Sequence, residues 1–111
     1  MNALRNRVQL MGHLGNDPEI INLKKGNKLA KFSLATNDAY TNKAGDKVET
    51  TEWHNIVAWG KTAELVENYL EKGKEVMIDG KLTYNQYETD KGEKRSFTQV
   101  RVNELLMVGK K

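Results

Sequence analysis

The period of the hydrophobic residues limits the fold of this 111-residue chain more than any other feature of its sequence. Apolar and polar residues alternate through five stretches, which is the pattern of half-buried β-strands. These stretches are residues 5–15, 29–37, 51–61, 74–88 and 95–109. Between the third and fourth stretches the spacing of apolar residues becomes helical. The sequence therefore predicts three strands, one helix and two more strands.

The helical segment is residues 61–73, KTAELVENYLEKG. Its apolar residues recur at the spacing of one helix face: Ala63, Val66, Tyr69 and Leu70. Thr62 is suited to cap the start, and Gly73 is suited to the left-handed conformation that ends many helices. These signals predict a helix of about three turns.

An all-β chain with this order of elements matches a five-stranded OB-fold barrel, in which one helix lies between strands 3 and 4. OB-folds are small, partly open barrels that bind oligonucleotides on one face. The length of 111 residues is enough for one core and too small for two. We therefore expect a single domain over residues 1–111.

Turn-forming residues separate the expected strands. DPE at 17–19 contains the only proline, and KKGNK at 24–28 is typical of a turn. The glycines of GHLG at 12–15 predict a bend in the first strand. Residues 38–49 are polar and contain glycine, so we expect a long flexible hairpin connection that carries Tyr40.

The composition excludes several classes of site. The chain has no cysteine, which excludes disulfides, thiolate metal sites and a cysteine nucleophile, and which fits a reducing, cytoplasmic location. The first residues are too polar for a secretory signal, and no apolar run approaches the roughly 18 residues of a membrane span. The formal charge of +3 and the pI near 9.1 indicate an anionic partner only weakly.

The motifs for catalysis and metal binding are incomplete. GKT at 60–62 ends like a phosphate-binding loop, but Asn55 stands where that loop needs a glycine. His13 and His54 lack the spacing of metal ligands, and His54 is interpreted as a packing or interface residue. Three glutamates are interpreted as a solvated helix face: Glu64, Glu67 and Glu71. Because no nucleophile with a base can be named, we expect no enzyme, no metal and no cofactor.

Trp53 and Trp59 are the only tryptophans, and their separation of six residues on one strand places both on the same side. They could fill the core, or they could lie outside it as flat surfaces for a ligand. Ile56 and Ala58, on the opposite side, suit the inside of a narrow barrel that has little room for two indoles. This arrangement favours tryptophans on the outside.

Other aromatic and basic residues point to a ligand that has both bases and phosphates. Tyr40, Tyr84 and Tyr87 lie in polar hairpins, which are poor core formers. Lysines are interleaved with the aromatic residues: Lys43, Lys47, Lys61, Lys72, Lys91 and Lys94. This mixture suits base stacking beside phosphate neutralisation in single-stranded nucleic acid, with solubilising charge as the alternative for any one lysine.

Two long segments, NRVQLMGHLGNDPEI and TEWHNIVAWGKTAELVENYLEKGKEVMIDGKL, and the spacing between them resemble the bacterial single-stranded DNA-binding protein family. The resemblance extends from Asn6 to about Val108. It implies an OB-fold subunit of a homotetramer that wraps single-stranded DNA without sequence preference. It also implies roles in DNA replication, recombination and repair.

The resemblance assigns roles to individual residues. It implies that the stacking aromatics are Tyr40, Trp53, Trp59 and Tyr87. It implies that the cations near the DNA path are Arg7, Lys61 and Lys72, and that His54 lies at a subunit interface. Tyrosine stands at two stacking positions where better-known members have tryptophan, and Trp59 stands where phenylalanine is common. Aromatic character is kept at all four.

Two other functions remain as alternatives. A replication-restart accessory protein of the same fold would form dimers and act mainly through protein contacts, but the full aromatic set argues against it. An OB-fold nuclease would need clustered carboxylates on the barrel face and a divalent metal. Both alternatives share the fold and differ in the site.

The C-terminus departs from the family pattern. Family members usually continue into a disordered Gly/Pro/Gln-rich tail with an acidic, hydrophobic tip that recruits partner enzymes, whereas this sequence stops at MVGKK. We therefore expect the acidic tail to be absent and tail-dependent partner enzymes not to bind. A natural short form and a shortened chain are both compatible with this ending.

Overall fold

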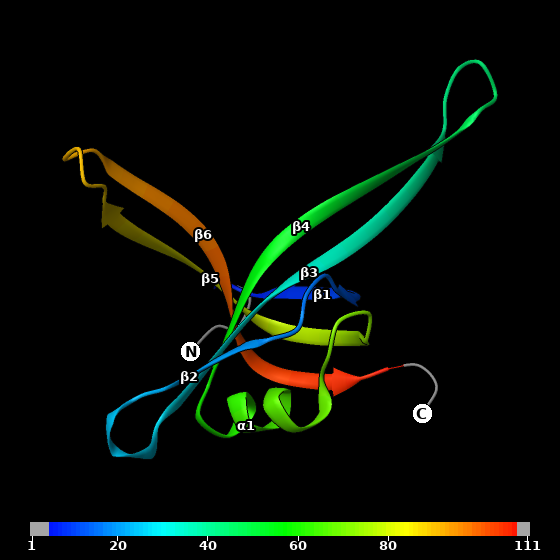
Figure 1. The fold of residues 1–111 in the computed structure, drawn as a ribbon. Helices are drawn as coiled ribbons and strands as arrows, with labels where there is room; N and C mark the ends of the chain where they lie inside the picture. The colour runs from blue at the N-terminus through cyan, green and yellow to red at the C-terminus, as the bar shows by residue number, and fades with distance from the viewer. Residues whose placement is uncertain (1–4, 109–111) are drawn as a thin grey trace.

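The computed structural model describes residues 5–108 as a small β-barrel with one helix at its lower end (Figure 1). The strands are β1 (Val8–Leu14), β2 (Glu19–Asn22), β3 (Lys28–Thr41), β4 (Lys47–Trp59), β5 (Glu75–Glu88) and β6 (Lys94–Met107). The helix α1 (Gly60–Tyr69) follows β4, and a short 3-10 turn spans Lys24–Gly26. The C-terminal residues 109–111, on which the tail expectation depends, lie outside the described residues.

The sheet closes into a barrel of five strands. The order of the whole sheet is β1-β5-β6-β4-β3-β2, and pairing of His13 and Leu14 of β1 with β3 closes the five strands other than β2. A short parallel contact joins Ile56 and Val57 of β4 to β6. The predicted all-β OB-fold, with its helix after the third long strand, is confirmed. The extra strand β2 was not predicted, because four residues paired along the edge of β3 are too short to show an alternation.

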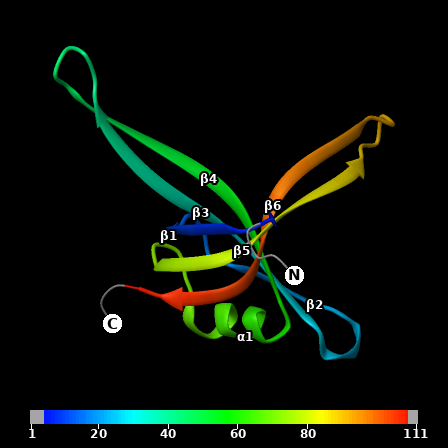
Figure 2. The ribbon, with the colours of Figure 1, turned by 180° about the vertical axis from the view of Figure 1, so that it is seen from behind.

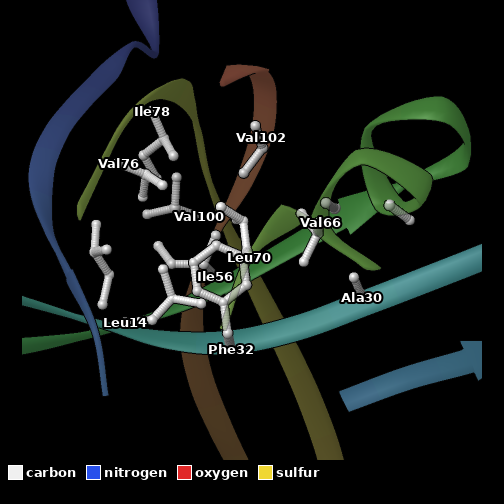
Figure 3. Packing of buried hydrophobic residues seen from close by; sticks show 13 residues of the cluster. Leu14, Ala30, Phe32, Ile56, Val66, Leu70, Val76, Ile78, Val100 and Val102 are labelled. Atoms are coloured by element: carbon white, nitrogen blue, oxygen red, sulfur yellow. The ribbon is translucent and has the colours of Figure 1, made fainter. Parts of the chain in front are cut away.

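Hydrophobic residues from the strands and the helix meet inside the barrel (Figure 3). The largest fully buried side chains of this cluster are Leu34, Ile56, Ile78, Val66 and Val76. Each such side chain contributes roughly 1.5–3 kcal/mol when it is removed from water. The helix supplies Ala63 and Val66, and Leu70 just after it is also buried, so α1 closes the lower end of the barrel.

The helix begins and ends earlier than predicted. It starts at Gly60, whose φ of 59° is left-handed, so the chain turns from β4 directly into the helix without a side-chain cap. The prediction that Thr62 caps the helix is therefore wrong. At the other end Leu70 is already extended, with its side chain in the core, and Gly73 with φ 90° lies in the turn that follows.

Two hairpins extend from the barrel as diverging arms (Figure 1, and from behind in Figure 2). We call residues 36–52 the β3–β4 arm and residues 83–99 the β5–β6 arm, because in each range the two strands pair only with each other. The predicted flexible connection at 38–49 is wrong in extent. The strands continue to Thr41 and resume at Lys47, and the turn between them is held by the Asn42 side chain.

Candidate nucleic-acid interface

Both tryptophans lie outside the barrel. The side chain of Trp53 is 62% exposed and that of Trp59 is 41% exposed, while Ile56 and Ala58 on the other face of β4 are buried. Their partners across the β3–β4 ladder are Ala35 and Leu29 respectively. The hypothesis that the indoles fill the core is wrong, and their predicted position on one outer face is confirmed.

Gly15 gives Trp53 the space in which its indole lies. A Cβ atom at position 15 would be 2.2 Å from Cζ3 of Trp53 and 2.8 Å from Oγ of Ser33. The indole edge therefore lies against the backbone at Gly15, which restricts the ring although much of it faces solvent. The sequence predicted only a bend at this glycine, because the contact joins residues that are far apart along the chain.

Trp59 is paired with a cation that the sequence analysis did not select. The guanidinium carbon of Arg101 is 5.5 Å from the centroid of the Trp59 ring, within the range of a cation–π interaction. Arg101 lies on β6 directly opposite Val57 of β4. An arginine at this place offers a positive charge next to an exposed stacking surface.

The β5–β6 arm adds a second pair of aromatic rings. Tyr87 and Phe97 have ring centroids 6.0 Å apart with an interplanar angle of 56°. Phe97 was not predicted as a site residue, although Arg95, Phe97 and Arg101 alternate in sequence and so share one face of β6. The parallel contact of Val57 with Arg101 makes that face continuous with the tryptophan face of β4.

We call the residues on this continuous outer surface the aromatic face. They are Trp53, Trp59, Tyr87, Phe97 and Arg101. Tyr40 is exposed but pairs with Val48, which places it on the opposite side of the β3–β4 arm, the side of Thr36 and His54. The register thus joins three of the four predicted stacking residues and separates Tyr40 from them.

The predicted cations occupy different places. Lys61 is exposed in the first turn of α1, two residues after Trp59. Lys72 is exposed after the helix, where its backbone N–H donates to Asp17 at 2.9 Å. Arg7 donates from Nε to Oδ1 of Asp79 at 3.0 Å, beside a pocket that no residue of the aromatic face lines.

His54 is half-buried on the side of β4 opposite the tryptophans. Its Nε2 lies 2.9 Å from Oγ1 of Thr36, and these two residues are on adjacent strands. A Cβ atom at Gly12 of β1 would lie 3.3 Å from the Thr36 side chain, so β1 crosses next to this pair. His54 therefore lies near the edge of the sheet that β1 forms.

The described part of the chain has few features that would support metal binding or membrane insertion. Among residues 5–108 no group of three or more His, Asp or Glu side chains is arranged to hold a metal ion. Glu67 of the helix instead accepts a hydrogen bond from the ammonium of Lys28, which raises the pKa of Lys28 above its ordinary value. Within the same residues, no helix has the length and apolar character needed to cross a bilayer.

A closed barrel of this topology with exposed aromatic rings and cations on one surface defines an OB-fold of the nucleic-acid-binding class. A family model described as the single-strand binding protein family matches residues 5–108. The chain belongs to this family.

Relatives of known name resemble the chain along nearly its whole length. "Single-stranded DNA-binding protein 1" of Chlorobaculum tepidum is 41% identical over 107 residues, which are 96% of this chain and 66% of that protein. The protein of the same name from Xylella fastidiosa is 38% identical over 98% of this chain and 81% of its own length. A protein from Neisseria meningitidis, at 38% identity, is matched over 60% of its length. The chain thus spans about two thirds of the curated relatives it matches.

Two solved structures share the fold. The SSB of Plasmodium falciparum in complex with ssDNA has a TM-score of 0.85 at 29% identity, with 94% of this chain and 95% of that chain covered. A deletion mutant of the single-stranded DNA binding protein from Thermus aquaticus has a TM-score of 0.80 at 34% identity. In that case 94% of this chain and 50% of the other are covered.

Proposed function

We propose that this chain binds single-stranded DNA without sequence preference, by base stacking and phosphate neutralisation. The observation that carries the proposal is the pair of exposed indoles, Trp53 and Trp59, on one outer face with Arg101 over the second ring. Family membership and the names of the relatives support the same ligand. Stacking accepts any base because every base has a π face.

Each predicted site residue has a role in this proposal. Trp53, Trp59 and Tyr87 stack bases along the aromatic face. Tyr40 contacts the single-stranded DNA from the other side of the β3–β4 arm. This requires the DNA to pass around that arm. The phosphate-neutralising residues are Arg7, Lys61 and Lys72, with Arg101 added. Because stacking and ion pairing break no bond, the proposed activity is binding and not catalysis.

We also propose that the subunits assemble as a homotetramer. Residues Val8–Gly12 of β1 pair with β5 only, so the other edge of β1 is free among the described residues. A cross-strand row of exposed apolar side chains lies on the outer surface next to it: Met11, Met77 and Leu106. Free strand edges and apolar patches favour contacts with other chains. His54 lies close to this edge and would be covered by the neighbouring subunit.

The biological setting is part of the proposal. Single-stranded DNA is exposed during replication, recombination and repair, and we propose that the protein covers and protects it in these processes. We propose a cytoplasmic location, because these processes take place in the cytoplasm of a bacterial cell.

One titration tests the central claim. Oligo(dT) is added while tryptophan emission is followed, and duplex DNA of equal length is the control. Stacked bases should quench the indoles, and duplex DNA should do so poorly. A mass measurement of the free protein separates the tetramer from a dimeric accessory protein. Absence of quenching and of binding by oligo(dT) would refute the proposed function.

A further inference from the structure

A pocket of about 280 Å³ opens on the outer surface where the two arms separate. Its lining includes Lys31 of β3, Asn55 of β4, Asn16 before β2, and Phe97 and Gln99 of β6. Asn55 lies between Trp53 and Trp59 on the same side of β4. Single-stranded DNA that crosses both indoles therefore passes this pocket. The volume is just below the range of roughly 300–1,000 Å³ for small-molecule pockets, which suits a single base.

One wall of the pocket is an aromatic ring held in place from the outside. Phe97 is 37% exposed, and Tyr87 packs against it at 6.0 Å with an interplanar angle of 56°. A tilted pair of this kind fixes the orientation of Phe97 and leaves part of its surface uncovered. The ring can therefore stack a base without first being ordered, which lowers the entropic cost of binding.

The other walls carry amide groups with free hydrogen-bonding capacity. Asn55 donates from Nδ2 to the carbonyl of Thr98 at 3.4 Å, while its Oδ1 accepts nothing from the described residues. Asn16 accepts from the backbone N–H of Ser33 at 3.0 Å and so keeps its NH₂ group available. The side-chain amide of Gln99 has no protein partner within residues 5–108.

We propose that this pocket binds one nucleobase of the single strand, which stacks on Phe97 and is hydrogen-bonded along its edge by Asn55 and Gln99. The inference rests on the proposed function and adds a subsite between the tryptophans. A side-chain amide has a donor group beside an acceptor, and each of the four bases also has a donor beside an acceptor. The pocket therefore requires a base but accepts any of them. Lys31 lines the same pocket opposite Glu19 of β2, and in this proposal its ammonium meets the adjoining phosphate.

The first test compares two exposed aromatic residues of the same arm. Phe97→Ala should weaken binding of a fluorescent oligo(dT) by roughly 5- to 150-fold, the range for one lost stack. The register places Tyr84, which the sequence grouped with the stacking tyrosines, on the other side of β5 from Tyr87 and Phe97, where it is 71% exposed. Tyr84→Ala is therefore the matched control. The control should change affinity less than twofold by the same assay. Phe97→Tyr should retain most of the affinity, and thermal melting should show all three variants folded.

The second test separates the pocket from indirect effects on Tyr87. Gln99→Leu leaves both rings in place and should weaken binding by roughly 2- to 10-fold, as expected for one or two lost hydrogen bonds. An oligo(dT) with one abasic residue, moved through successive positions, should lose affinity for the unaltered protein. The same oligonucleotides should lose less with Phe97→Ala. Cross-linking of 5-iodouracil oligonucleotides, read by peptide mass, should include a peptide that contains Phe97.

The outcomes distinguish this proposal from the general function. If oligo(dT) quenches the tryptophans but Phe97→Ala and Gln99→Leu bind as tightly as Tyr84→Ala, the pocket proposal is wrong and the proposed function stands. Cross-links at Trp53 and Trp59 with none at Phe97 would lead to the same conclusion. If the unaltered protein binds no oligo(dT), both proposals are wrong.

Discussion

The two faces of β4 show opposite relations between side-chain size and burial. The inward face carries Ile56 and Ala58, which are buried, whereas the outward face carries the two largest side chains of the strand, Trp53 and Trp59. Hydrophobicity alone would place the indoles inside. The space within a five-stranded barrel excludes them, since its interior is already filled by aliphatic side chains. Large apolar residues that a fold leaves outside indicate a binding surface.

Val57 shows that the outward face is not uniformly open. It lies between Asn55 and Trp59 on the outer side of β4, yet it is 1% exposed. Its neighbours in the ladders are Lys31 and Arg101, whose long aliphatic stems can cover a small side chain. The basic residues of this face therefore combine packing with charge. The comparison of the two faces predicts that inner substitutions act on stability and outer ones on binding.

The largest effect is expected for the inner face. Ile56→Ala removes a fully buried side chain from the inner face of β4 and should lower the free energy of unfolding by about 2–5 kcal/mol. Urea denaturation followed by circular dichroism measures this change. The fraction that remains folded should bind oligo(dT) with unchanged affinity. A loss of affinity without a loss of stability would contradict the division between the two faces.

Trp53→Ala is the corresponding change on the outer face. It should weaken binding of oligo(dT) by roughly 1–3 kcal/mol, because one stacking surface is lost. The urea midpoint should stay close to that of the unaltered protein, since the ring is 62% exposed. Trp53→Phe serves as the control and should retain most of the affinity. If Trp53→Ala unfolds and the residual folded protein binds normally, the indole stabilises the core and does not stack bases.

Gly15→Ala tests whether the position of the indole matters as well as its presence. The added Cβ would lie 2.2 Å from Trp53, so the ring must move. Affinity for oligo(dT) should fall by about 1 kcal/mol, at the lower end of the range for a lost stack. Gly15→Ala combined with Trp53→Ala should bind no more weakly than Trp53→Ala alone, as expected for two residues that act through one ring. Additive losses in this double-mutant cycle would show that Gly15 acts by another route.

The long strands could be predicted because each has one face in the core. Alternation therefore appears in residues such as Phe32, Leu34 and Ile56, and it fixes the number and order of the main elements. Residues 38–49 were assigned to a flexible connection because the β3–β4 arm has no core. Both of its sides face solvent, so pairing of the strands leaves no hydrophobic period in the sequence.

The site could be predicted only where it depends on the alternation of side chains along one β-strand. The separation of Trp53 and Trp59 places them on one face whatever the neighbouring strands do. The side of Tyr40 depends on the register across the hairpin, which the turn at 42–46 sets and the sequence does not reveal. Gly15 and Arg101 reach the tryptophans from other strands, so their roles appear only in three dimensions.

A smaller effect is expected for the charge on the outer face. In the proposed mechanism the logarithm of the binding constant falls linearly with the logarithm of salt concentration, by about 0.7 for each phosphate contacted. Arg101→Ala should reduce this slope by about 0.7 and also remove the cation beside Trp59. Arg95→Ala is the comparison: Arg95 lies on the same face of β6 but pairs with Glu93, so its loss should reduce the slope less than the loss of Arg101. An unchanged slope for Arg101→Ala would limit that residue to packing over Trp59 and Val57.

The smallest effect concerns the ion pair between Lys28 and Glu67, which joins β3 to α1. The hydrogen bond to Glu67 raises the pKa of Lys28 above its ordinary value of 10.5. A raised pKa in the folded state means that the pair stabilises the fold below pH 10.5 and that this stabilisation is lost as the pH rises through the raised value. Lys28→Gln should therefore lower the urea midpoint slightly near neutral pH, and the difference from the unaltered protein should disappear at higher pH.

Lys91→Gln, in the exposed turn of the β5–β6 arm, is the control and should show no such pH-dependent difference. Because both side chains of the pair are partly exposed, the effect is expected to be small and to weaken with added salt. A difference that persists above the raised pKa would mean that Lys28 stabilises the fold through its aliphatic stem and not through its charge.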